Sequence, residues 1–383
     1  MPEAIKLTKK IQMVDLVSQH ETCKAELDAA IQKVLAHGAF INGPEVKTFG
    51  QNLANYLNVK HLVPCANGTD ALQIALMALD LKPGDEIITT SFNYVAGAEA
   101  VALLSMKPVF AEVNQQSFNL DVSSLEKHIT SKTKAIIIVH LFGQACDMDE
   151  LMALAEKHQL YVIEDNAQSL GTEINFKGNW QKAGTIGHIG TTSFFPTKNL
   201  GCMGDGGAVF SNDEVLMNKC KSISSHGQGQ RYEFQRIGIN SRLDTIQAAI
   251  LEIKLKSLKD SLEKRKKSAE KYFELLTGVK NIQLPTTETF STHTYNQFVI
   301  KVIDDQRDIL KQFLSDHQIP SMIYYPKPLH LQPAYAYLNY KQGNFPISEH
   351  LCGQVLALPI HPELSGEQIL YITDRIKDFF HAR

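Results

Sequence analysis

The chain contains seven short runs of apolar and β-branched residues, mostly separated by stretches in which apolar residues recur at helical spacing. The runs cover residues 61–65, 86–90, 108–113, 135–140, 160–164, 191–195 and 207–211. Several of them are apolar throughout, which is typical of strands that helices cover on both faces. The pattern therefore predicts an α/β fold built on a seven-stranded, mostly parallel sheet between helices.

The 383 residues exceed what one hydrophobic core usually serves, so we expect two domains. A helical pattern that begins at Asp244 runs into a highly charged stretch at residues 259–267, where the composition changes. Beyond it we expect one strand and two helices, at residues 295–302, 308–317 and 369–380. We predict a large domain over residues 1–255, which includes an N-terminal helical segment, and a smaller α+β domain over residues 256–383.

The composition argues against several classes of protein. The 38 basic and 41 acidic residues give a net charge of −3, which does not indicate a nucleic-acid surface. The N-terminus lacks the pattern of a signal peptide, and no apolar stretch is long enough to cross a bilayer. Six scattered cysteines without a C-x-x-C pair indicate reduced thiols and no zinc site. We expect a cytoplasmic protein that binds neither membrane nor metal.

Two polar residues follow buried strands, where ligands bind in open α/β sheets. Asp165 comes directly after the run at 160–164, and Lys198 follows the run at 191–195. A lysine placed after a buried strand can lose its proton and act as a nucleophile. Taken alone, however, Asp165 also fits a helix N-cap, and Lys198 also fits a surface lysine.

A third candidate is the pair Gly68-Thr69, between the first strand and a helical pattern. Glycine lets the backbone approach a ligand closely, and the free N–H groups of a helix start attract phosphate. No G-x-G-x-x-G follows the first strand and no G-x-x-x-x-G-K-[ST] occurs, which disfavours a dinucleotide or a nucleoside triphosphate. A lysine for a Schiff base, an aspartate for a pyridinium nitrogen and a phosphate cradle are what pyridoxal phosphate requires.

The chain resembles, over nearly its whole length, the DegT/DnrJ/EryC1/StrS family of nucleotide-sugar aminotransferases. The motifs that carry this resemblance lie at residues 193–201, 164–168 and 238–244. The resemblance implies the aspartate aminotransferase-like fold (fold type I), with pyridoxal 5′-phosphate bound to Lys198 as a Schiff base. It also implies that Asp165 pairs with the pyridinium nitrogen and that Gln168 contacts the ring hydroxyl.

The resemblance assigns four more residues around the cofactor and one to a second subunit. Tyr94 matches the aromatic residue that stacks on the ring. Asn240 matches an asparagine that reaches the phosphate in the partner subunit, which implies a homodimer with shared active sites. The phosphate itself would be held by Gly68, Thr69 and Ser193.

By the same resemblance, an amino donor such as L-glutamate converts the cofactor to pyridoxamine 5′-phosphate, which aminates a nucleotide-linked keto-sugar. Residues 65–74 and 226–228 are similar to enzymes that aminate C3 of a UDP- or dTDP-linked 3-keto-sugar, including the UDP-linked 3-oxo-N-acetylglucosaminuronate type. The product would enter a bacterial surface glycan such as lipopolysaccharide O-antigen.

Four residues are candidates for binding the sugar nucleotide, because arginine suits phosphate or carboxylate and tyrosine can hydrogen-bond hydroxyls. Each of them also fits a surface loop or a subunit contact. They are Arg231, Arg242, Tyr325 and His330.

Three other functions stay open: a 4-keto-sugar aminotransferase, a pyridoxal-phosphate-dependent sugar dehydratase, and a non-catalytic regulator of the same fold. The related dehydratases carry histidine in place of the lysine, whereas this chain has Lys198. Asn166 and Met203 depart from residues common in the family, which puts the immediate surroundings of the cofactor in doubt without removing a catalytic group.

Overall fold

A computed structural model describes residues 9–381, and within them seven strands form one sheet. In spatial order the strands are β1 (His61–Cys65), β9 (Gly207–Ser211), β8 (Ile189–Ser193), β5 (Tyr161–Asp165), β4 (Thr133–Val139), β2 (Glu86–Thr90) and β3 (Lys107–Ala111). Each corresponds to one of the seven apolar runs, so the predicted sheet is confirmed.

Most neighbouring strands of this sheet are parallel. β3, β2, β4, β5 and β8 run in one direction, whereas β9 is antiparallel to both β8 and β1. β1 therefore runs in the same direction as β8. As a result, the carboxyl ends of β1, β2, β4, β5 and β8 all lie at one edge of the sheet, which positions the loops that follow them.

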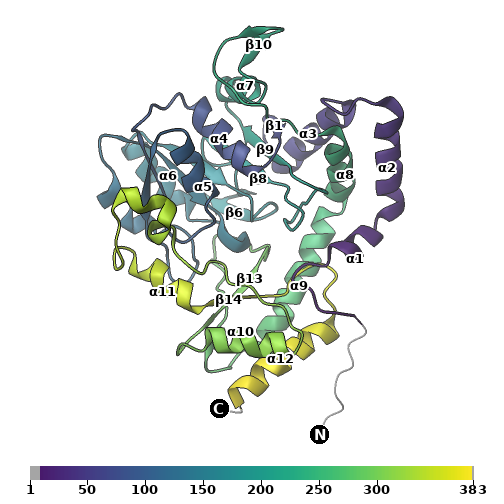
Figure 1. The fold of residues 1–383 in the computed structure, drawn as a ribbon, viewed down its shortest axis with the longest axis vertical. Helices are drawn as coiled ribbons and strands as arrows, with labels where there is room; N and C mark the ends of the chain where they lie inside the picture. The colour runs from purple at the N-terminus through teal and green to yellow at the C-terminus, as the bar shows by residue number, and fades with distance from the viewer. Residues whose placement is uncertain (1–8, 382–383) are drawn as a thin grey trace.

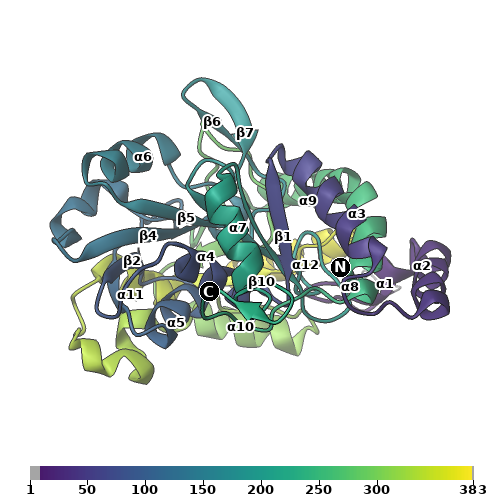
Figure 2. The same ribbon diagram turned by 90° about the horizontal axis from the view of Figure 1, so that it is seen from above.

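Helices cover both faces of the sheet, as the apolar runs predict. In β4, Ile136 and Ile138 pack against one group of helical residues, and the alternating Ala135 and Ile137 pack against another. Figure 2 shows α6 on one side of the central strands and α4 and α5 on the other. The covering helices are α6 (Met148–Lys157) on one face and α4 (Gly68–Ala78), α5 (Ala96–Leu103) and α7 (Glu214–Ile223) on the opposite face.

Further helices and two hairpins surround this sheet. The hairpins are formed by short, mostly polar strands, whose pattern the apolar periodicity did not reveal. The helices are α1 (Leu16–Glu21), α2 (Lys24–His37), α3 (Pro44–Leu57) and α8 (Thr245–Lys256), and the hairpin strands are β6 (Glu173–Phe176), β7 (Asn179–Lys182), β10 (Gln228–Gln230) and β11 (Glu233–Phe234).

The C-terminal part of the chain lies at the lower end of the molecule in Figure 1 and has a hydrophobic core of its own. The helical pattern from Asp244 is two helices, because Ser257 separates α8 from α9. The predicted boundary at 255/256 therefore falls at the end of α8, and the division into domains stays a prediction. The C-terminal elements are α9 (Leu258–Leu276), β12 (Ile282–Gln283), β13 (Phe298–Val302), α10 (Arg307–Asp316), α11 (Pro346–Gln354), β14 (Val355–Leu358) and α12 (Gly366–His381).

The N-terminal segment also contributes to this C-terminal core. Ile11 is 2% exposed and packs among residues of α9, β13 and α12. The backbone N–H of Ile360 donates to the carbonyl of Met13 at 3.4 Å. Residues from the start of the chain thus pack beside residues near its end. Within residues 9–381, none of the helices combines the length and apolar character needed to cross a bilayer.

Candidate active site

The loops at the common carboxyl edge of the sheet bring the cofactor residues predicted from the sequence to one region. Gly68 follows β1, Tyr94 follows β2, Asp165 ends β5, and Ser193 and Lys198 end or follow β8. Asp165 pairs in register with Thr191 of β8, two residues before Ser193. These residues come from four separate segments, and the parallel pairing of the strands makes them neighbours.

Asp165 and Lys198 form the electrostatic centre of this region. Burial raises the pKa of the Asp165 carboxyl group, which is 8% exposed, while the backbone N–H of Ala167, Lys198 and His140 act in the opposite direction. The Ala167 N–H donates to Oδ1 of Asp165 at 2.9 Å. Burial lowers the pKa of the Lys198 amine, and the negative charge of Asp165 opposes that shift. A lowered pKa makes the neutral, nucleophilic amine more available.

The start of α4 lies against the end of β8. The side chain of Asn67 caps the helix, since its Oδ1 accepts from the Asp70 N–H at 2.8 Å. A Cβ added at Gly68 would lie 2.7 Å from the Cβ of Ser193, which is closer than real Cβ atoms approach. Glycine is therefore required for this close contact, and the N–H groups at the helix start can hold an anion there.

Gln168 is 4% exposed and is fixed by hydrogen bonds at both ends of its amide. Its Oε1 accepts from the Phe142 N–H at 2.8 Å, and its Nε2 donates to the Tyr325 hydroxyl at 3.0 Å. The ring of Tyr325 lies 6.4 Å from that of Tyr94, which is 60% exposed. The region thus contains an oriented amide beside an aromatic ring with a free face.

These residues fit pyridoxal phosphate. Asp165 is a buried carboxyl group that can pair with a protonated ring nitrogen, Lys198 is an amine with a lowered pKa, and Gly68 opens a helix start to phosphate. The fold and this set of residues define a pyridoxal-phosphate-dependent aminotransferase.

Residues 21–377 match the DegT/DnrJ/EryC1/StrS aminotransferase family, and the chain belongs to this family. A UDP-2-acetamido-2-deoxy-3-oxo-D-glucuronate aminotransferase from Pseudomonas aeruginosa is 43% identical and covers 94% of this chain and 98% of its own length. A UDP-N-acetyl-3-dehydro-alpha-D-glucosamine 3-aminotransferase from Acidithiobacillus ferrooxidans is 41% identical, with 97% and 98% covered. A pleiotropic regulatory protein from Geobacillus stearothermophilus is 42% identical, with the same coverage.

Solved structures agree with the predicted fold type. The S. venezuelae enzyme DesV, solved in complex with a ketimine intermediate, superposes with a TM-score of 0.94 at 37% identity and covers 97% of this chain and 99% of its own. The Bacillus subtilis protein NtdA, solved with bound cofactor PMP, superposes with a TM-score of 0.88 at 30% identity, with 98% and 86% covered. Enzymes of this family use pyridoxal phosphate.

The four candidate sugar-binding residues lie in different environments. Tyr325 joins the cofactor residues through Gln168. His330 is 2% exposed, and its ring nitrogens lie 2.6 Å from Ser91 Oγ and 3.1 Å from Glu349 Oε1, so both are already engaged.

The two arginines and Asn240 lie on the segment that contains the β10–β11 hairpin. Arg231 is exposed and stacks over Tyr232, and Asn240 is also exposed. Nε of Arg242 is buried and has no hydrogen-bond partner among residues 9–381. The Ser241 hydroxyl accepts from the Ala66 N–H at 3.0 Å, which places this segment beside the loop before Gly68. The substrate roles of these residues stay predictions.

The buried pair His140 and Glu164, both of which are 0% exposed, lies next to Asp165 and is not among the residues predicted from the sequence. His140 Nε2 lies 2.8 Å from Glu164 Oε2, and its Nδ1 accepts from the Cys146 N–H at 3.0 Å. Glu164 also accepts from the N–H groups of Gly184, Ile186 and Gly187. A glutamate directly before Asp165 in an apolar strand is the signal that would have revealed this pair.

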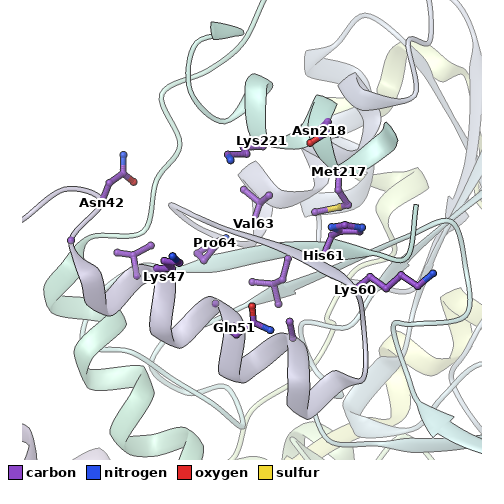
Figure 3. Close-up of a pocket in the computed structure, with 15 residues that line it drawn as sticks. Asn42, Lys47, Gln51, Lys60, His61, Val63, Pro64, Met217, Asn218 and Lys221 are labelled. Carbon is purple, nitrogen blue, oxygen red and sulfur yellow. The ribbon is translucent and has the colours of Figure 1, made fainter. Parts of the chain in front are cut away.

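A cavity of about 500 Å³ lies away from the cofactor residues, against the outer strand β1 (Figure 3). Side chains from α3, β1 and α7 line it, including Lys47, His61 and Lys221. None of the predicted site residues borders this cavity. The candidate active site therefore lies at the strand ends, and this cavity is not part of it.

Proposed function

We propose that this enzyme transfers an amino group from L-glutamate to C3 of a UDP-linked keto-sugar. The names of the Pseudomonas and Acidithiobacillus relatives, which specify 3-oxo and 3-dehydro UDP-linked sugars, support this substrate. The observation that carries the reaction type is Lys198, whose pKa is lowered by burial, in electrostatic contact with buried Asp165.

Pyridoxal phosphate, when bound, supplies an aldehyde that exchanges amino groups and a ring that withdraws electrons from the carbon bearing the amine. In our proposal, the carboxylate of Asp165 holds a proton on the ring nitrogen. Gln168 uses one N–H for Tyr325 and the other for the ring hydroxyl, since an amide nitrogen has two donor hydrogens. Gly68, Thr69 and Ser193 hold the phosphate.

Lys198 has two roles in this proposal: it attaches the cofactor covalently, and its Nζ moves a proton. With the cofactor bound, the Nζ amine would take the proton from the α-carbon of the amino donor and deliver it to the cofactor carbon that receives the amino group, because its lowered pKa leaves it able to accept a proton. Tyr94 covers one face of the ring, which its exposed side chain is free to do.

The proposal includes a homodimer in which Asn240 reaches the partner's phosphate site. Large apolar side chains are exposed in and after the β10–β11 hairpin: Tyr232 by 76%, Phe234 by 61% and Ile237 by 85%. Figure 1 shows this hairpin projecting from the body of the molecule. Exposed apolar patches mark protein interfaces. We further propose that the enzyme works in the cytoplasm on a precursor of a bacterial surface glycan such as O-antigen.

Incubation of the purified holoenzyme with L-glutamate tests this function. We expect one equivalent of 2-oxoglutarate per site and conversion of the bound cofactor to its pyridoxamine form. The second candidate, a non-catalytic regulator, rests on the Geobacillus relative and predicts an unchanged spectrum. Amination of a 4-keto sugar nucleotide alone would overturn the assignment to C3.

A further inference from the structure

A second, smaller cavity of about 320 Å³ lies beside the loop that carries Lys198. Its wall includes Thr197, which directly precedes Lys198, and Tyr324, which directly precedes Tyr325. The N-terminal segment closes it on another side with Gln12, Met13 and Val14. Two residues of its lining are therefore adjacent in sequence to candidate active-site residues.

One wall of this cavity is fixed relative to the cofactor contacts. The N–H of Gln297 donates to the carbonyl of Phe142 at 3.3 Å, and the N–H of Phe142 donates to Gln168 Oε1 at 2.8 Å. Gln297 and its neighbour Asn296 both line the cavity. A group bound there is thus held at a defined position relative to Gln168.

Asn296 provides an unused hydrogen-bond acceptor. It is 5% exposed, and its Nδ2 donates to Gln297 Oε1 at 2.8 Å. Its Oδ1 is buried and has no hydrogen-bond partner among the described residues. Buried polar atoms are nearly always hydrogen-bonded in folded proteins, so this oxygen indicates a ligand that brings an N–H or O–H donor.

Four of the other lining residues are apolar, and no residue that lines the cavity is charged. Leu358 and Ile360 are almost fully buried, and they lie with Met13 and Val14 around the same space. Moving a carboxylate from water into a site without a cationic partner costs more free energy than the contacts in the site provide. The carboxylates of the amino donor are therefore excluded from this cavity. An uncharged group with one N–H and a small apolar end fits both walls.

We propose that this cavity binds the acetamido group at C2 of the sugar, so that the substrate belongs to the 2-acetamido-3-keto class of nucleotide sugars. The inference rests on the proposed amination of C3: C2 is bonded to the reacting carbon, so its substituent falls beside Lys198. The amide N–H donates to Asn296 Oδ1, and the methyl group packs against Met13 and Val14.

Two commercial nucleotides provide a matched test, since UDP-N-acetylglucosamine and UDP-glucose differ only in the acetamido or hydroxyl group at C2. We expect calorimetric titration of the enzyme, with and without cofactor, to give a Kd for UDP-N-acetylglucosamine that is at least about tenfold lower than the Kd for UDP-glucose. Asn296→Ala should reduce that preference to about threefold or less, and Val14→Phe, which fills the cavity, should do the same. Asn179→Ala, on the exposed hairpin β6–β7, should keep the wild-type ratio.

Equal affinity for the two nucleotides, or no binding of either, overturns this inference. A preference that survives both cavity substitutions overturns it as well, since the acetamido group then binds elsewhere. The glutamate half-reaction of the wild-type enzyme is measured on the same preparation. If that reaction fails, the proposed function fails; if it proceeds without discrimination between the nucleotides, only the acetamido site is wrong.

Discussion

The hydroxyl of Tyr325 lies 3.0 Å from Nε2 of Gln168, and this hydrogen bond joins the C-terminal part of the chain to the edge of the seven-stranded sheet. Burial raises the pKa of Tyr325, so the hydroxyl keeps its proton in neutral solution. Because Gln168 is also bonded to Phe142, its amide cannot turn freely. The C-terminal part of the chain thus helps to orient a residue that we propose contacts the cofactor ring.

Tyr325→Phe tests that relationship. Removal of the hydroxyl leaves Nε2 of Gln168 without this partner, at a cost of about 1–3 kcal/mol. We expect kcat to fall by about tenfold, together with a shift in the absorbance spectrum of the bound cofactor. The control is Tyr337→Phe, since that side chain is 58% exposed. An unchanged spectrum and kcat would show that the hydrogen bond only supports the fold.

Gly68→Ala tests the phosphate cradle. The added Cβ would lie 2.7 Å from the Cβ of Ser193, so the start of α4 must move away from β8. We expect the affinity for pyridoxal phosphate to fall at least about tenfold, which corresponds to about 1.4 kcal/mol in an equilibrium titration. At Gly353 an added Cβ meets nothing within 4 Å, so Gly353→Ala should bind the cofactor normally. Equal affinities of the two variants would contradict the cradle.

Mixed dimers test whether the sites are shared. In our proposal, a site needs Lys198 of one subunit and Asn240 of the other. Lys198→Ala should lose turnover and the linkage that borohydride traps, and Asn240→Ala should bind the cofactor phosphate weakly. When the two variants are unfolded and refolded together, each mixed dimer regains one complete site, so activity should exceed the sum of the separate variants. Activity equal to that sum would argue for sites built within one subunit.

His140→Leu tests the buried pair beneath Asp165. The substitution removes the hydrogen bonds of His140 with Glu164 and with the Cys146 N–H but leaves the bonds to Glu164 from Gly184, Ile186 and Gly187. We expect the free energy of unfolding in urea to fall by about 2–3 kcal/mol, because the substitution leaves buried polar groups without a hydrogen-bond partner. In the exposed pair Lys157–Glu126, Lys157→Ala should cost less than about 1 kcal/mol. Similar losses of unfolding free energy in the two variants would show that burial does not make the His140–Glu164 pair more stabilising than the exposed pair.

His293 should contribute to the pH dependence of the protein's free energy of unfolding. Burial lowers the pKa of its imidazole to about 3, and its Nδ1 accepts from the Tyr295 N–H at 2.9 Å. Because the folded-state pKa lies below the ordinary value of 6.5, the unfolded chain binds the proton more readily. The stabilising contribution is full above pH 6.5 and is lost as the pH falls towards 3.

His293→Asn keeps an acceptor at this position but removes the titrating group. Between pH 7 and pH 5 in urea denaturation, the wild-type protein should therefore lose more free energy of unfolding than the variant does. Parallel losses in the two proteins would show that His293 does not contribute.

The sequence by itself determined the sheet and the order of the cofactor residues along it. Runs such as 135–140 are apolar at every position because helices cover both faces of β4, so the local pattern carried the tertiary information. The same pattern placed Asp165 and Lys198 after strands, and parallel pairing brought those strand ends together.

Only the tertiary structure decided which residues surround this edge from elsewhere in the chain. Gln168 and Tyr325 are 157 positions apart, and Gln12 and Asn296 line the same cavity. His330 turned out to be held between Ser91 and Glu349, although its sequence neighbours suggested a binding loop. Such contacts depend on how the C-terminal part packs against the sheet. Local residue patterns do not encode that packing, because the sequence around each contacting residue is compatible with many positions of its segment relative to the sheet.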